Sequence, residues 1–267
     1  MKKGERKVLD YGDVLLREAD VALLEGPHWL NDQVVSFYFE YLEREALQLA
    51  RATTATATAT AAAGASGVLL LPPATCFLLM HAGPDMAADV LAPLKPSRRG
   101  LVLLPVNDNP DVERAAGGSH WSLLIYHRPS NSLRHYDSSG GSGNAAAARR
   151  LAAAVGPALQ PPGGAGGGAG SSGSSGSGGS SSGRPELVEV ADMPHQTNGH
   201  DCGVYVLAVA RAACEEWLSE EGEAGEEGGE VRRWREWERG LRRRLTPEAV
   251  KALRREVREL IREKAGE

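Results

Sequence analysis

Cysteine and histidine side chains that could carry out acyl transfer stand at separate places in this chain. Cys202 lies in the segment QTNGHDCGVYV, directly before an apolar run that predicts a buried helix. The unsatisfied N–H groups at a helix N-terminus carry partial positive charge and favour the thiolate, which is the reactive form of cysteine. Cys202 is therefore predicted to be a nucleophile.

A partner for this nucleophile is predicted by the hairpin of residues 120–137. A loop at residues 128–131 sets Ser122 opposite Asp137, and His120 then lies diagonally from that aspartate on the same face. Such neighbours are about 7–8 Å apart at Cα, within reach of a His–Asp hydrogen bond. An aspartate in this position holds the imidazole tautomer and stabilises the protonated ring. His120 with Asp137 is thus a candidate general base.

An oxyanion stabiliser is predicted upstream of the cysteine, where Gln196 offers a neutral side-chain amide. Asn198 and Gly199 mark the intervening segment as a loop, and Gly203 is expected to leave the backbone beside Cys202 approachable. A backbone N–H at the nucleophile together with an amide donor meets the requirement of an oxyanion hole. The predicted catalytic constellation is His120, Asp137, Gln196 and Cys202.

The composition limits the class of protein. The chain has 267 residues with 30 basic and 35 acidic side chains, a formal net charge of -5 that argues against a nucleic-acid binder and favours a protein partner. No apolar run approaches the ~20 residues that cross a bilayer, and the charged opening leads into no signal peptide, so we expect no membrane contact and a soluble monomer in the cytoplasm and/or nucleus. Three cysteines are too few for a disulfide framework, and neither a metal nor another cofactor is expected.

Residues 1–267 are predicted to form a single domain that carries insertions. The Ala/Thr tract at 51–67 and the Gly/Ser tract at 156–185 lack the large apolar side chains that offset ordering entropy, so we expect disordered surface insertions there. An acidic, Gly-rich loop at 219–230 is a third interruption.

Helical and strand patterns interleave between these breaks, which predicts an α+β fold. The expected helices are 31–47, 71–80, 85–94, 144–155, 203–214 and 246–264. The expected strands are 100–108, the hairpin 120–137, and 186–194. Asn31, Asn144 and Thr246 stand where they can cap helices, with Pro247 at a first helical position.

The motifs HWLNDQVVSFYFEY, HWSLLIY, HYDS and QTNGHDCGVYV occur in this order and resemble the ubiquitin-like-protein-specific cysteine proteases. Residues 103–126 and the segment LTPEAV are most similar to the sentrin-specific protease branch that acts on the neddylation modifier, the deneddylases. The resemblance covers about 1–50, 68–155 and 186–265. It implies a papain-like fold with a central mixed sheet packed by helices, with His120 as general base, Asp137 as its orienter, Cys202 as nucleophile and Gln196 as oxyanion donor.

The same resemblance implies a substrate and the residues that bind it. The expected activity is cleavage after the C-terminal Gly-Gly of the modifier, which processes its precursor or releases it from conjugates, with cullin-type proteins as the expected class. Trp29 and Trp121 would cover the extended tail of the modifier, and flat rings on both sides of a peptide exclude every Cβ, so only glycines pass. Residues expected near the substrate are Asn31, Asp32, Asn107 and Asp108.

Other interpretations of the cysteine stay open. Cys202 could be a buried structural thiol, as Cys76 and Cys214 are expected to be. His195 and His200 could form a metal cluster with Cys202, although no fourth ligand accompanies them. The position of Cys202 at a helix start favours the nucleophile over these two alternatives.

Alternatives also remain for the partners and the substrate. His135 shares a face with Asp137 and could compete for it, although a packing role is favoured. Trp29 and Trp121 could be ordinary core aromatics, as is expected of the remaining tryptophans. The enzyme could act on SUMO or ubiquitin instead, or the chain could be a non-catalytic module that binds a ubiquitin-like protein.

Overall fold

The computed structural model describes residues 4–48, 67–113, 117–140, 143–160, 183–220 and 228–266. The predicted insertions at 51–67, 156–185 and 219–230 lie for the most part outside the described residues. The edge of one of them differs from the prediction, because helix α5 (Ala145–Leu159) continues beyond residue 155. The side chain of Leu159 is fully buried, which holds this last turn against the core.

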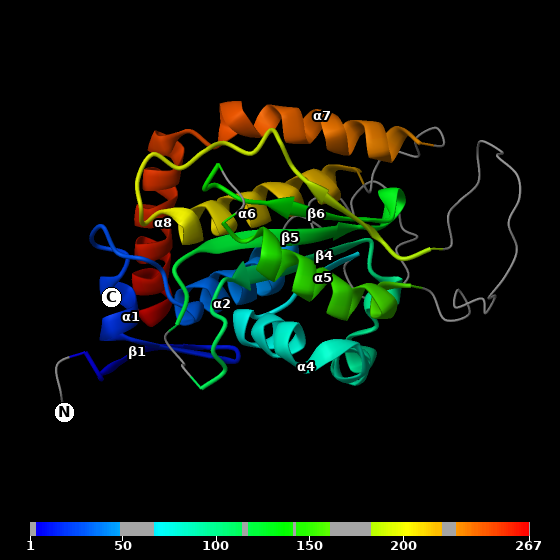
Figure 1. Cartoon of the computed structure of the whole chain (residues 1–267). Coiled ribbons are helices and arrows are strands. Elements are labelled where there is room, and N and C mark those ends of the chain that lie inside the picture. The colour runs from blue at the N-terminus through cyan, green and yellow to red at the C-terminus, as the bar shows by residue number, and fades with distance from the viewer. Residues whose placement is uncertain are drawn as a thin grey trace, which may run out of the picture.

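A five-stranded mixed sheet lies at the centre of the described chain (Figure 1). In spatial order its strands are β3 (Val68–Leu70), β4 (Leu101–Asn107), β5 (Trp121–His127), β6 (Ser132–Tyr136) and β7 (Glu186–Glu189). The two outer pairs are parallel and the two inner pairs are antiparallel. This arrangement confirms the predicted α+β class and the mixed sheet.

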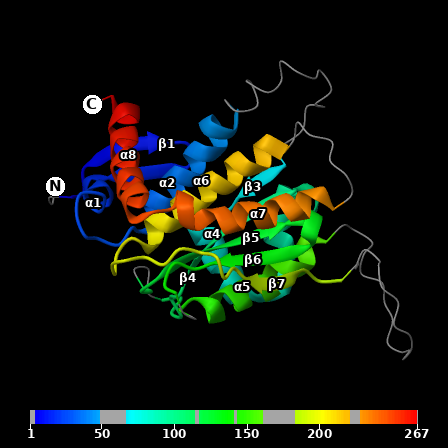
Figure 2. The ribbon, with the colours of Figure 1, turned by 90° about the horizontal axis from the view of Figure 1, so that it is seen from above.

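Helices cover both faces of this sheet (Figures 1 and 2). One face packs on α4 (Pro73–Leu91) and α5, and the other on α2 (Asp32–Tyr41), α6 (Cys202–Glu220), α7 (Gly229–Arg244) and α8 (Pro247–Ala265). Side chains alternate between the two cores along each strand, so Leu101 and Leu103 enter one while Val102 and Leu104 enter the other. A strand covered on both faces reads as a continuous apolar run, as 101–106 does.

The predicted helix starts at Asn31 and Thr246 are confirmed. The side chain of Asn31 accepts a hydrogen bond from the backbone N–H of Val34 at 3.1 Å, and Thr246 caps α8 in the same way with Pro247 in its first turn. The two helices predicted at 71–80 and 85–94 form one element, α4, which bends at Gly83, where φ is 82°. The starts of α2 and α8 therefore reflect local capping signals.

Several short elements complete the chain. They are β1 (Lys7–Tyr11), β2 (Val14–Arg17), α1 (Glu18–Ala22), the π-helix η1 (Leu42–Ala46), and the 3-10 turns η2 (Ala92–Leu94), η3 (Pro96–Arg98) and η4 (Arg128–Ser130). The hairpin of β1 and β2 and the strand β3 are absent from the predicted elements. The available sequence signal for that hairpin was Gly12 between the two strands, a glycine that adopts a φ of 60° in the turn.

Candidate active site

Strands β5 and β6 form the predicted hairpin in the predicted register. His127 pairs with Ser132, so the ladder runs to Asp137, which lies directly beyond β6. His120 Nε2 lies 2.6 Å from Oδ1 of Asp137. The two side chains are 12% and 7% exposed. The predicted contact between His120 and Asp137 is therefore confirmed.

Cys202 is the first residue of α6, and it is 2% exposed. His120 forms hydrogen bonds with both Asp137 and Cys202. Burial lowers the pKa of His120, but these two hydrogen bonds outweigh it and raise the pKa to about 10. Burial raises the pKa of Asp137, whereas hydrogen bonds from His120 and the Ser139 backbone lower it to about 2. At neutral pH the imidazole is thus protonated and the carboxylate is charged.

Two further side chains hold this pair in place. Oδ1 of Asp108 accepts hydrogen bonds from the backbone N–H groups of Ser119 and His120, at 2.5 and 3.0 Å. Asn144 donates its backbone N–H to Oδ2 of Asp137 and its side-chain amide to the carbonyl of His120, both at 3.2 Å. The predicted side-chain cap at Asn144 is wrong, because its amide is used in the site instead. Asp108, expected near the substrate, instead binds the loop before His120.

Gln196 is held against the end of the hairpin. Its backbone N–H and its Oε1 both bind Ser138, at 2.8 Å to the carbonyl and 2.8 Å to Oγ. Nε2 of Gln196 donates to the carbonyl of Asn198 at 2.6 Å. A carboxamide nitrogen carries two hydrogens, so one donor remains beyond this bond. Gln196 is not among the described residues that line the cavity beside Cys202.

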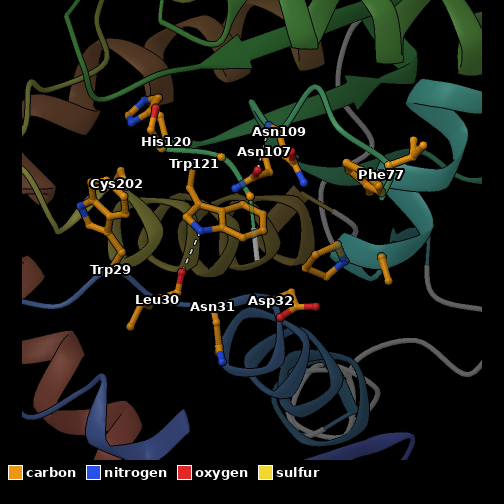
Figure 3. A pocket seen from close by; sticks show the side chains of 16 residues that line it. Trp29, Leu30, Asn31, Asp32, Phe77, Asn107, Asn109, His120, Trp121 and Cys202 are labelled. Carbon is orange, nitrogen blue, oxygen red and sulfur yellow. Dashed lines mark hydrogen bonds between the residues drawn. The ribbon is translucent and has the colours of Figure 1, made fainter. Parts of the chain in front are cut away.

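A cavity of about 560 Å³ opens beside Cys202 (Figure 3). Five of the six residues expected at the substrate line it, together with His120 and Cys202: Trp29, Asn31, Asp32, Asn107 and Trp121. Figure 3 shows His120, Cys202 and Trp29 at one end and Phe77 of α4 at the other. The structure thus brings these sequence-predicted residues to a single cavity.

The two tryptophans of the cavity differ in how they are held. Trp121 is 8% exposed and donates Nε1 to the carbonyl of Leu30 at 2.8 Å. Trp29 is 49% exposed and donates Nε1 to the carbonyl of Gly199. A Cβ at Gly203 would lie 3.0 Å from Cβ of Leu30, so this glycine permits close packing rather than leaving the backbone open as expected.

Sequence reasoning missed the apolar end of this cavity. It is lined by Pro73, Ala74 and Phe77 of α4 and by Val112, which is 60% exposed. Residues such as Phe77 read as ordinary core positions of a helix, so the sequence contained no signal that they face a cavity.

The structure also tests the alternative partners. His135 places its Nδ1 2.6 Å from Oε2 of Glu189 and its Nε2 2.8 Å from Oγ of Ser122, so its two ring nitrogens do not contact Asp137. Within the described ranges, no group of three or more His, Cys, Asp or Glu could hold a metal ion, which contradicts a cluster at His195. Nor does any described helix have the length and apolar character to cross a membrane.

The other two cysteines are core residues, as predicted. Cys76 and Cys214 are each 2% exposed, and all three cysteines are free. Burial raises the pKa of both thiols, that of Cys214 to about 12. Trp234 and Trp237 are likewise buried in the core.

Known proteins resemble this chain in both sequence and structure. No protein-family model matches it. It is 34% identical over 263 residues to NEDD8-specific protease 1 of Arabidopsis thaliana, covering 98% of this chain and 95% of that protein. It is 30% identical over 217 residues to sentrin-specific protease 8 of Homo sapiens, covering 81% and 85%.

Two solved structures show the same fold. The SUMO protease Ulp1 with its catalytic cysteine oxidized to a sulfenic acid has a TM-score of 0.60, 16% identity, and coverage of 98% of this chain and 90% of that one. The C-terminal Ulp1 protease domain in complex with Smt3 has a TM-score of 0.57 at 16% identity, covering 100% and 91%.

Proposed function

The chain belongs to the ubiquitin-like-protein-specific cysteine proteases, and on that premise we propose that it is a deneddylase that cleaves after the C-terminal Gly-Gly of NEDD8. The observation that carries this proposal is the match over nearly the full length of a NEDD8-specific protease, together with a His–Asp pair in contact with a cysteine at a helix start. The Ulp1 structures, at 16% identity, support the fold alone.

In the proposed mechanism Cys202 and His120 act as a thiolate–imidazolium pair. The thiolate attacks the carbonyl of the last glycine, and His120 donates a proton to the departing lysine amine or tail peptide. Water then hydrolyses the thioester, with His120 as the base. Asp137 keeps the imidazole oriented, and its buried hydrogen bond supports that role.

The tetrahedral oxyanion is held by the backbone N–H of Cys202 and by Nε2 of Gln196. The fixed position of Gln196 on Ser138 supports this role, because a preorganised donor costs no reorganisation during the reaction. The second hydrogen on Nε2 is the one directed to the oxyanion, since the first binds Asn198.

Selection for glycine follows from the cavity walls. Trp29 and Trp121 press on the tail of the modifier, and any side chain larger than hydrogen is rejected there. Asn31, Asp32 and Asn107 line the same cavity and contact the tail. Conjugates of cullin-type proteins are the expected substrates.

The experiment that tests this proposal uses three probes: NEDD8, SUMO and ubiquitin, each with a thiol-reactive group at its C-terminus. The purified chain is incubated with each, and the adduct is mapped by mass spectrometry. Labelling of Cys202 by the NEDD8 probe alone is expected. Preferential labelling by SUMO or ubiquitin would overturn the substrate while keeping the chemistry, and no labelling by any probe would favour a binding module.

A further inference from the structure

Arg254 lies on α8, 53 residues after Asp201, and is 8% exposed. Its Nε and Nη2 donate to Oδ1 of Asp201 at 3.0 and 2.8 Å. Nη1 donates to the carbonyl of Leu23 at 2.7 Å, and Nη2 donates to the carbonyls of His28 and His200 at 3.1 and 3.2 Å. One guanidinium on α8 therefore binds two segments that are remote in sequence, residues 23–28 and 200–201.

These segments carry two walls of the candidate active site. His28 directly precedes Trp29, and Asp201 directly precedes Cys202. Trp29 also donates its indole N–H to the carbonyl of Gly199, so the two segments contact each other directly as well as through Arg254. Helix α8 stands beside the start of α6 in both views (Figures 1 and 2).

The same ion pair extends toward the predicted oxyanion donor. Oδ2 of Asp201 accepts from Nδ2 of Asn198 at 2.7 Å, and the carbonyl of Asn198 accepts from Gln196. Asp201 is 4% exposed, so without Arg254 its carboxylate would be buried next to Cys202 and would lose its guanidinium partner. The ring of His200, whose Nε2 lies 3.9 Å from Oδ1, would remain beside it. Arg254 thus joins the two segments and also provides a positive charge for the buried carboxylate of Asp201.

We propose that Arg254 is a positioning residue for the cleavage reaction. It fixes the Trp29 segment against the start of α6 and neutralises the carboxylate beside the nucleophile, although it does not line the cavity. The substrate in this inference rests on the proposed function, whereas the positioning of the segments around Cys202 by Arg254 does not. Helix α8 therefore helps to position the active-site residues.

The test compares Arg254→Met and Arg254→Lys with the wild-type chain on a NEDD8 fusion cleaved at its C-terminus. For Arg254→Met we expect kcat/KM to fall about 100-fold, because misplacement of reacting groups by about 1 Å costs that much. Lysine keeps a positive charge beside Asp201, but it lacks the planar guanidinium that reaches the carbonyls of Leu23 and His28. Arg254→Lys should therefore recover most of kcat while KM stays raised.

A matched control separates positioning from loss of folding. Arg211 on α6 pairs with Glu256 on α8 at 2.7 Å, so Arg211→Met loosens the same two helices without touching the loop. Rates are divided by the concentration of sites titrated with the NEDD8 probe, and Tm is measured for every variant. Asp201→Asn combined with Arg254→Met should regain part of kcat relative to Arg254→Met alone, because the unpaired carboxylate is gone.

Three results would overturn the inference: normalised kcat/KM within 3-fold of wild type for Arg254→Met, an equal loss for Arg211→Met, or no recovery of kcat in Arg254→Lys and in the double variant. Alkylation of Cys202 by iodoacetamide, which needs no modifier, is measured in parallel. If wild type fails to cleave NEDD8 yet alkylation still slows in Arg254→Met, then the proposed substrate fails while the positioning role stands.

Discussion

The two ends of strand β5 place a histidine in opposite surroundings. At the site end, where β5 and α6 begin, burial disfavours the charge on His120, but bonds to Asp137 and Cys202 prevail and raise its pKa to about 10. At the hairpin end, His127 is stacked on Trp234 with ring centroids 4.5 Å apart. There burial and the charge of Arg134 lower the pKa of His127 to about 3.

A carboxylate accounts for most of this difference. Each imidazole is removed from water, which disfavours its charged form, but only His120 has an anionic partner within hydrogen-bond distance. A buried carboxylate, Glu238, does lie on the same face of the sheet, but its two oxygens accept hydrogen bonds from Nε and Nη2 of Arg134, each at 2.6 Å. At the site end, the charged His120–Asp137 pair is therefore available for catalysis. At the hairpin end, the Arg134–Glu238 ion pair instead attaches α7 to the sheet.

The largest expected effect comes from the cysteines of α6. Cys202→Ala at the site end should lower the rate of modifier release by at least about 10⁴-fold, since no other thiol can form the acyl intermediate. Cys214→Ala, further along the same helix, should leave the rate unchanged and lower the stability by about 1 kcal/mol. Gel-based cleavage of a NEDD8 fusion and thermal unfolding measure both. Release by Cys202→Ala at the wild-type rate would contradict the nucleophile assignment.

The two histidines should respond in opposite ways to the same substitution. His120→Gln should reduce kcat/KM per folded molecule by about 10³-fold, within the usual range for loss of a general base, and should also lower Tm because Asp137 loses its buried partner. His127→Gln should keep the activity per folded molecule and lower the unfolding free energy by about 2–3 kcal/mol, because a polar amide replaces a stacked ring. Equal losses of activity in both variants would remove the distinction between the two ends.

The buried ion pair of Arg134 and Glu238 should affect stability without affecting activity. Glu238→Gln leaves Arg134 buried without a carboxylate and should cost about 3–5 kcal/mol of stability. Because this pair lies away from the cavity, kcat/KM per titrated site should stay within about 2-fold of wild type. Urea unfolding and site titration measure the two quantities. A selective fall in kcat would show instead that α7 contributes to the site.

The last contrast between the two histidines is in the pH dependence of stability. The folded pKa of His127 is below the ordinary value of about 6.5, so its stabilisation is present above about pH 6.5 and is lost as the pH falls toward 3. Linkage gives a loss on the order of 2 kcal/mol between about pH 6.5 and 4.5, which His127→Gln should abolish.

His120 should affect the folding stability at alkaline pH. Its folded pKa is raised, so its stabilisation is present below about pH 6.5 and is lost as the pH rises through about 10. His120→Gln should flatten only this alkaline limb. Denaturant unfolding from pH 4 to 10 would contradict both assignments if each variant retained the wild-type profile.

Local patterns were sufficient for much of the fold. The hairpin register followed from a four-residue loop, and the caps at Asn31 and Thr246 followed from side-chain type. The strand β3 escaped prediction because three apolar residues beside a low-complexity tract contain too little periodicity to separate strand from loop. The extension of α5 to Leu159 depended on burial that only the packed core supplies.

For the site, sequence by itself determined the side chains that could react and those joined by local geometry. Cys202 at a helix start and His120 diagonal to Asp137 follow from backbone periodicity, which repeats over a few residues. Only the tertiary structure decided that Arg254 reaches Asp201 and that Phe77 faces the cavity. Contacts between remote residues depend on how whole helices pack against the sheet, and no local spacing encodes that arrangement.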